Sequence, residues 1–210
     1  MKLQRANIWV ALALVGLSGC ASMNADECAA TDWSAIGYED GSRGYTTNRF
    51  GSHRKACAKH GITPDFQAYL GGRDQGLQNF CRPGRAFNFG ANGGRYNGVC
   101  ADDMEPGFLE AYRAGSKLHT LRANVNDANS HLYASESELE NTRKRIVAAE
   151  LLLISDDVTT DERIALLVEL KELSERKGKL KHEIKQLIAD QARLEQELQS
   201  YEQTVASYGY

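Results

Sequence analysis

The fold of this chain is decided in its second half, which begins at residues 116–153 with SKLHTLRANVNDANSHLYASESELENTRKRIVAAELLL. Apolar and small residues recur along this stretch in alternating steps of three and four, a spacing that places them on one face of an α-helix. The positions of this stripe are Leu118, Leu121, Val125, Ala128, Leu132, Ser135, Leu139, Thr142, Ile146, Ala149 and Leu153. The stretch therefore predicts one long helix with a heptad seam.

A second heptad helix follows after a short break at residues 155–157. Thr159 and Glu162 have the spacing of a capping box, which marks the start of a helix. The second seam comprises Leu166, Leu170, Leu173, Lys177, Leu180, Ile184, Leu187, Gln191, Leu194, Leu198, Tyr201 and Val205. Two heptad helices of similar length joined by a short turn favour an antiparallel α-helical coiled-coil hairpin over residues 116–210, with arms about 60–70 Å long.

Polar and small residues weaken this seam. Lys177 and Gln191 occupy seam positions, where polar side chains can fix register or oligomeric state at a cost in stability. Ala128, Ser135 and Ala149 have small side chains, so the first seam buries little apolar surface at these positions. The periodicity therefore leaves open whether the seam closes within one chain or within a four-helix assembly of two chains.

The first half, residues 28–115, contains all three prolines and most of the glycines, whereas residues 116–210 have almost no glycine. An aromatic residue is followed three positions later by glycine at Tyr38–Gly41, Tyr69–Gly72, Phe87–Gly90 and Tyr112–Gly115. The clearest copies of this diverged repeat carry Tyr38, Gly41 and Gly44, and Tyr69, Gly72 and Gly76. Each glycine inside a helix lowers the stability of that helix by about 1 kcal/mol relative to alanine. Several glycines in one helix are therefore expected only where close packing requires them. Glycines three or four apart share a helix face, which predicts a small domain of helices packed closely through glycine faces.

Local signals give a coarse layout for this domain. Helices are expected at residues 32–44, 49–60 and 64–80. Pro64 suits a helix start. The density of glycine and asparagine between residues 82 and 100 predicts a loop or a small hairpin. Pro106 then predicts the start of a helix that runs on into the first heptad seam.

The N-terminus predicts export and lipid attachment. Residues 1–19 combine basic residues with an apolar run at residues 8–15 that is too short to span a bilayer, as in a signal peptide. Leu17-Ser18-Gly19-Cys20 resembles the bacterial lipobox, in which the cysteine receives a diacylglyceryl group and becomes the first residue of the mature chain. The alternative is an ordinary signal peptide cleaved near Ala21.

Acyl chains on Cys20 would anchor the mature chain to a membrane without a spanning helix, because each buried methylene contributes about 0.8 kcal/mol. Residues 20–27 are expected to form the lipidated tether. Ala21 and Ser22, with no aspartate beside the cysteine, favour the outer membrane by analogy with lipoprotein sorting. The chain is then expected to face the periplasm.

The first half also contains an even number of cysteines, which in an exported chain predicts disulfides. They are Cys28, Cys57, Cys81 and Cys100. Three pairings are possible and the sequence does not choose among them, although Cys28–Cys57 and Cys81–Cys100 would close loops of moderate length. A small core of this kind depends on such cross-links.

One combination of residues in the first half resembles a known family. The residues are Cys28, Trp33, Gly37-Tyr38-Glu39-Asp40-Gly41, Cys57, residues 69–77, Cys81 and Tyr96-Asn97-Gly98-Val99-Cys100. Through them residues 28–115 resemble the bacterial lipoproteins of domain-of-unknown-function family 2799. The resemblance implies an exported lipoprotein but supplies no activity, substrate or catalytic residue. The coiled coil lies outside it.

Three residues have a spacing that suits a metal. His53, Cys57 and His60 would place two imidazoles and a thiolate on one helix face. In an oxidising compartment Cys57 is instead expected in a disulfide, so we expect neither a metal nor a cofactor.

Asp40 and Asp74, one in each clear repeat copy, could form a carboxylate pair for acid–base chemistry if they faced each other across a cleft. The simpler interpretation is surface carboxylates paired with Arg43 and Arg73. The sequence contains no hydrolase triad, phosphate-binding glycine loop or zinc helix motif, so we expect no catalytic residues and no enzymatic activity.

Two functions fit these observations. The first is a non-catalytic scaffold in the cell envelope, in which the hairpin engages a protein partner or a second copy. The alternative is a module that binds peptidoglycan or another glycan, with its candidate loop residues at Asn88, Asn92, Arg95, Tyr96 and Asn97. A formal net charge of −3 gives no indication of nucleic-acid binding.

Overall fold

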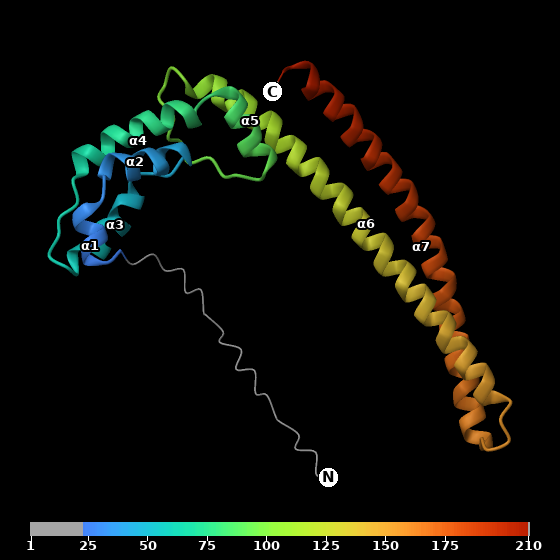
Figure 1. The fold of residues 1–210 in the computed structure, drawn as a ribbon. Coiled ribbons are helices and arrows are strands. Elements are labelled where there is room, and N and C mark those ends of the chain that lie inside the picture. The colour runs from blue at the N-terminus through green and yellow to red at the C-terminus, as the bar shows by residue number, and fades with distance from the viewer. Residues whose placement is uncertain (1–22, 210) are drawn as a thin grey trace, which may run out of the picture.

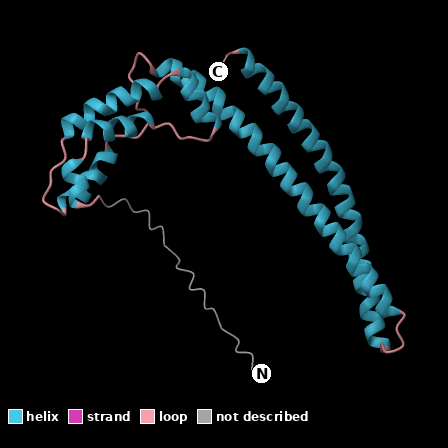
Figure 2. Cartoon of the chain, viewed as in Figure 1, coloured by secondary structure: helices cyan, strands magenta, loops and turns pink. Residues whose placement is uncertain are grey.

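The computed structural model describes residues 23–209, and every regular element in this part of the chain is an α-helix (Figure 2). The helices are α1 (Ala25–Ala30), α2 (Trp33–Ser42), α3 (Asn48–Ala58), α4 (Phe66–Phe80), α5 (Pro83–Ala91), α6 (Glu105–Leu153) and α7 (Thr160–Ser207). The predicted fold class is confirmed: a small disulfide-bonded helical domain precedes a long helical hairpin. The predicted signal peptide and Cys20 lie outside the described residues, and the last residues of the predicted tether belong to α1.

The chain consists of a small head and a long arm (Figure 1). We call residues 23–115 the head, which contains α1 to α5 and the first turns of α6. We call residues 116–209 the hairpin, which contains the rest of α6 and α7. Because α6 runs through the junction without a break, one continuous helix connects the two parts. The turn between α6 and α7 lies at the end of the hairpin farthest from the head (Figure 1).

The first helix pair of the head, α2 with α4, is packed through glycines. A Cβ atom on Gly37 would lie 2.0 Å from the carbonyl oxygen of Tyr69, and one on Gly72 would lie 1.8 Å from that of Ser34. A second glycine on each helix approaches the partner's main chain in the same way. Only residues without a side chain permit so close an approach. The two clearest copies of the repeat are therefore the two partners of one helix pair.

The second helix pair, α5 with the start of α6, repeats this contact. A Cβ atom on Gly90 would lie 2.4 Å from the carbonyl oxygen of Tyr112, and one on Gly115 would lie 2.0 Å from that of Phe87. The predicted packing through glycine faces is thus confirmed in both pairs. Gly44 has another role, because it follows the end of α2 with a positive φ of 73° that favours glycine.

Capping residues fix the helix starts. Asp32 accepts hydrogen bonds from main-chain N–H groups in the first turn of α2, and Asp65 does the same at α4. Thr159 and Glu162 form the predicted capping box at α7. The helices expected at residues 32–44, 49–60 and 64–80 agree with α2, α3 and α4 to within two residues at each end.

The predicted loop at residues 82–100 is wrong in its first half, where Pro83–Ala91 forms α5. Pro83 stands in the first turn, where its missing N–H breaks no helical hydrogen bond. The side chains of Asn88 and Asn92 each donate a hydrogen bond to the carbonyl oxygen four residues earlier. Gly90, which suggested a loop, is the contact with α6. Packing between helices therefore outweighs the loop-like composition.

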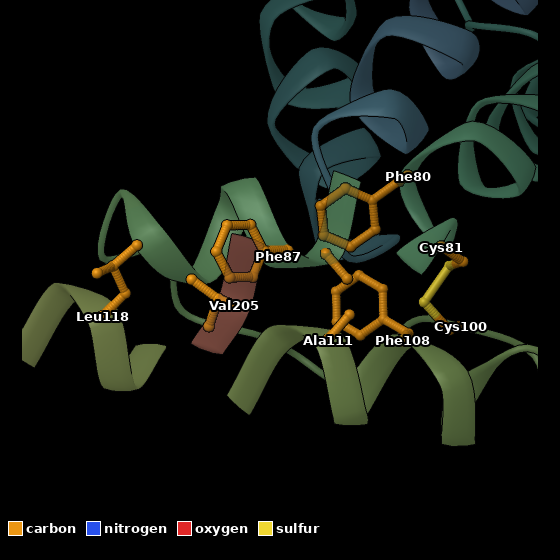
Figure 3. Packing of buried hydrophobic residues seen from close by; sticks show 9 residues of the cluster. Phe80, Cys81, Phe87, Cys100, Phe108, Ala111, Leu118 and Val205 are labelled. Atoms are coloured by element: carbon orange, nitrogen blue, oxygen red, sulfur yellow. A yellow bond between two sulfur atoms is a disulfide. The ribbon is translucent and has the colours of Figure 1, made fainter. Parts of the chain in front are cut away.

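Two hydrophobic clusters form the core of the head, and each contains one disulfide. The disulfides are Cys28–Cys57 and Cys81–Cys100. The first lies in the cluster of Trp33 and the fully buried Tyr69. The second lies beside the fully buried Phe108 (Figure 3). Neighbouring cysteines are therefore paired, and each cross-link holds the core of one helix pair.

The hairpin closes within one chain. Every predicted seam position of α6 and α7 is buried or half-buried. Beside the seam, the guanidinium of Arg176 donates to both carboxylate oxygens of Glu138, at 2.7 and 2.8 Å. Arg145 likewise donates to Glu169 at 2.7 Å. These pairs join residues far apart in sequence and fix an antiparallel register.

The end of α7 is attached to the head. The hydroxyl of Tyr201 donates to the carbonyl oxygen of Ala114 at 3.0 Å. Val205 is buried in the core of the second helix pair, beside Phe87 and Leu118 (Figure 3). Both helices of the hairpin are therefore held at its base.

Candidate functional site

A buried polar cluster joins α2, α3 and α4 around Asp40. The hydroxyl of Tyr69 donates to Oδ2 of Asp40 at 3.0 Å, and Nε2 of His53 lies 3.2 Å from the same oxygen. Nε of Arg49 lies 3.9 Å from the other carboxylate oxygen. Burial first, and then the hydrogen bond to Asp40, raises the pKa of Tyr69 well above its usual range. The phenol therefore stays protonated as a donor, and the cluster cross-links three helices.

The three metal-ligand candidates in and just after α3 do not form a metal site. Cys57 is bonded to Cys28, His53 faces Asp40, and His60 is exposed beyond the end of the helix. No group of three or more His, Cys, Asp and Glu side chains within residues 23–209 is arranged to hold a metal ion.

The structure also separates the two aspartates of the repeat. Asp40 is buried in the polar cluster, whereas Asp74 is exposed on α4. The expected arginine partners are also wrong. Arg43 pairs with Glu39 at 3.0 Å, and the guanidinium of the buried Arg73 donates to a main-chain carbonyl of the turn after α2. Sequence reasoning thus missed that Asp40 and Arg73, one charged residue from each copy of the repeat, are buried and support the helix packing.

The candidate glycan-binding residues serve different purposes. Asn88 and Asn92 donate to main-chain carbonyls of α5. The hydroxyl of Tyr96 donates to Glu105 and accepts from the main-chain N–H of Cys100, and burial raises its pKa. Arg95 and Asn97 are exposed. Of the predicted set, only these two side chains are directed to solvent without a hydrogen-bonding role in the described part of the chain.

A polar hollow lies beside Asn97. It has a volume of about 360 Å³ and is lined by Tyr45, Thr46, Asn48, Arg49, Ser52 and Asn97. The guanidinium of Arg49 stands over the ring of Tyr45, 5.3 Å from its centroid. One ring, two amides and two hydroxyls surround a space that can hold a small polar group.

The end of the hairpin exposes a group of large apolar side chains. We call residues 147–168 the tip. Large apolar side chains of both helices are more than half exposed there: Val147, Leu151, Leu152, Ile154, Ile164, Leu167 and Val168. They occupy positions outside the heptad seam, so closing the hairpin leaves them uncovered. The tip is therefore the main candidate for a binding surface.

Residues 32–117 match the model of a family described as "Protein of unknown function (DUF2799)". The predicted resemblance to this family is confirmed over these residues, which make up most of the head. The match begins at the cap of α2 and ends just past Gly115, so it includes both glycine-packed helix pairs and leaves all but the first two residues of the hairpin outside.

Neither the curated proteins nor the solved structures include a match to the chain. Among residues 23–209, no helix has both the length and the apolar character to cross a membrane.

Proposed function

We propose that this protein is a non-catalytic lipoprotein of the cell envelope, anchored through lipid on Cys20, that works as a scaffold for another protein in the periplasm. The head holds the base of the hairpin, and the hairpin presents its tip to the partner. The observation that carries this proposal is the tip itself, with seven large apolar side chains exposed at the end of the hairpin.

The length of the hairpin allows its tip to contact a partner far from the head. At about 1.5 Å per residue, the 48 residues of α7 extend about 70 Å. Tyr201 and Val205 attach its last turns to the head, so the base of the arm cannot open without exposing core residues. An arm fixed in this way carries its tip at a defined distance from the head.

The described chain begins at the end of the head farthest from the arm (Figure 1). Cys20 precedes Met23, the first described residue, by three positions. The described chain then enters α1, which lies at the end of the head away from α5 and α6 (Figure 1). A lipid at Cys20 would therefore attach the head to the membrane near α1. By analogy with lipoprotein sorting, we propose the periplasmic face of the outer membrane.

Photocrosslinking in intact cells tests this proposal. A photoreactive residue replaces Ile154 at the tip, and a control replaces Tyr133, which is 75% exposed on α6 but far from the tip. We expect one dominant protein adduct from position 154 that is absent from position 133. Equal adducts from both positions, or only adducts with a second copy, would contradict a scaffold that works through its tip.

The polar hollow favours one second candidate, a glycan-binding module. A sugar could stack on the ring of Tyr45 while Arg49 and Asn97 read its hydroxyls. The test is retention of the purified full chain on purified sacculi. This candidate predicts that Asn97→Ala and Tyr45→Ala abolish retention, whereas Arg95→Ala, a change at an exposed residue outside the hollow, does not.

A further inference from the structure

The tip combines apolar surface with a hollow. A cavity of about 330 Å³ opens on it between the two helices, lined by Leu152, Val158, Glu162, Ala165, Leu166 and Glu169. Four of its lining residues are aliphatic and two, Glu162 and Glu169, are acidic. A space of this size and chemistry accepts one or two apolar side chains from another molecule.

The charge of this region is mainly negative. Residues 150–169 contain six carboxylates and one basic residue, Arg163. The guanidinium of Arg163 donates to the main-chain carbonyls of Leu153 and Ser155, so it is used in closing the turn. The tip therefore has no free cation to balance its carboxylates within the described chain.

Four of the six carboxylates have no partner among residues 23–209. Glu162 is held by the capping box and Glu169 by Arg145. The remaining four make no ion pair with another described residue and are exposed: Glu150, Asp156, Asp157 and Asp161. They belong to the same segment as the exposed apolar side chains and give it negative charge.

We propose that the tip binds a segment of another protein that combines apolar side chains with lysine or arginine. This inference rests on the proposed scaffold function and names the chemistry of its partner. Apolar side chains of the partner fill the hollow beside Leu152, and its cations meet the unpaired carboxylates. A second copy of the tip would bring like charges together, and an anionic lipid surface would do the same.

The probe is a fluorescent 14-residue amphipathic peptide of leucine and lysine, compared with a peptide in which glutamate replaces every lysine. Binding to the full chain, purified in detergent, is followed by fluorescence anisotropy. The tip variant is L151S/I154S, at side chains that are 62% and 77% exposed. The matched control is Y133S/I188S, at side chains that are 75% and 49% exposed elsewhere on the hairpin. Because all four side chains are exposed, neither variant is expected to impair folding.

We expect the lysine peptide to bind and the glutamate peptide not to bind. L151S/I154S should weaken binding at least about tenfold, and Y133S/I188S less than about twofold. D156N/D157N/D161N should weaken binding and reduce its dependence on salt.

Three results would overturn the inference. They are equal binding of both peptides, equal effects of the tip and control variants, and a concentration-dependent dimer that L151S/I154S abolishes. If the lysine peptide does not bind while position 154 still crosslinks to one protein in cells, the proposed scaffold function stands. The proposed apolar and basic character of the partner is then wrong. If both fail, the scaffold function fails as well.

Discussion

Replacing Gly72 by alanine is expected to disrupt the packing of α2 against α4. The new Cβ would lie 1.8 Å from the carbonyl oxygen of Ser34; the Cβ is bonded directly to the main chain of α4, and the oxygen belongs to the main chain of α2. No side-chain rotation can relieve this contact, so the helices must separate by about 1 Å or more. Overpacking costs about 1–3 kcal/mol where side chains can adjust, and here we expect the upper end, about 3 kcal/mol.

Gly71 provides the matched control. It is the neighbouring residue of the same helix, it is exposed, and a Cβ there would meet no atom within 4 Å. Alanine at this position should stabilise α4 by up to about 1 kcal/mol through helix propensity alone. The two variants have identical composition, so the difference between them isolates the contact with α2.

Trp33 reports the unfolding of the head, because it is 7% exposed in the first core cluster and the other tryptophan precedes the predicted cleavage site. In a thermal scan followed by its fluorescence, Gly72→Ala should lower the Tm by about 12 °C or more. Gly71→Ala should leave the Tm unchanged or raise it. Equal Tm values for the two variants would refute a main-chain contact at Gly72.

Three further predictions concern other parts of the chain. Tyr69→Phe removes the hydroxyl that donates to Asp40, so the head should lose about 1–3 kcal/mol in urea unfolding followed by the same fluorescence, and an unchanged midpoint would contradict the buried cluster. Val205→Asp should raise amide hydrogen exchange in the last two turns of α7 by about tenfold or more while the tip is unaffected, whereas uniform exchange would contradict its burial in the head. The hydrogen bond from Arg176 lowers the pKa of Glu138, so this pair stabilises the hairpin above the unfolded pKa of glutamate, about 4.3, and the stability is lost as the pH falls through the folded pKa. Arg176→Gln should therefore lower the Tm at pH 7 and match the unsubstituted chain near pH 2, and a difference independent of pH would exclude this pair as its source.

The hairpin could be predicted from sequence because its determinants are local. A seam from Leu118 to Leu153 depends only on residue spacing, and the start of α7 depends on Thr159 and Glu162, three residues apart. Spacing and caps act within one helix, so no knowledge of distant contacts is needed.

The rest of the fold depends on contacts between distant residues. The composition around Gly90 favours a loop, and it is helical because Gly90 packs on Tyr112. The partner of α2 is α4 rather than the adjacent α3, which the glycines spaced by four on both helices could have indicated. The cluster of Asp40, His53 and Tyr69 has no sequence signal, since its members come from three helices.

The tip was also missed, although a signal for it was present. In the run from Leu151 to Ile154, only Leu153 belongs to the seam. Apolar residues on the remaining faces of a two-helix hairpin have no partner within the chain, and they are exposed in the structure. A search for apolar residues outside the seam would have found this surface.

The central claim is that α7 folds back on α6 of the same chain and fixes the arm that presents the tip. Nitroxide labels at Arg122 and Glu202, which form an ion pair of 2.8 Å at the base of the hairpin, test it by pulsed electron paramagnetic resonance. With helix axes about 8–10 Å apart, we predict one narrow distance distribution below about 25 Å that survives dilution with unlabelled protein. A broad distribution beyond about 40 Å, or a short distance that dilution removes, would contradict a hairpin closed within one chain.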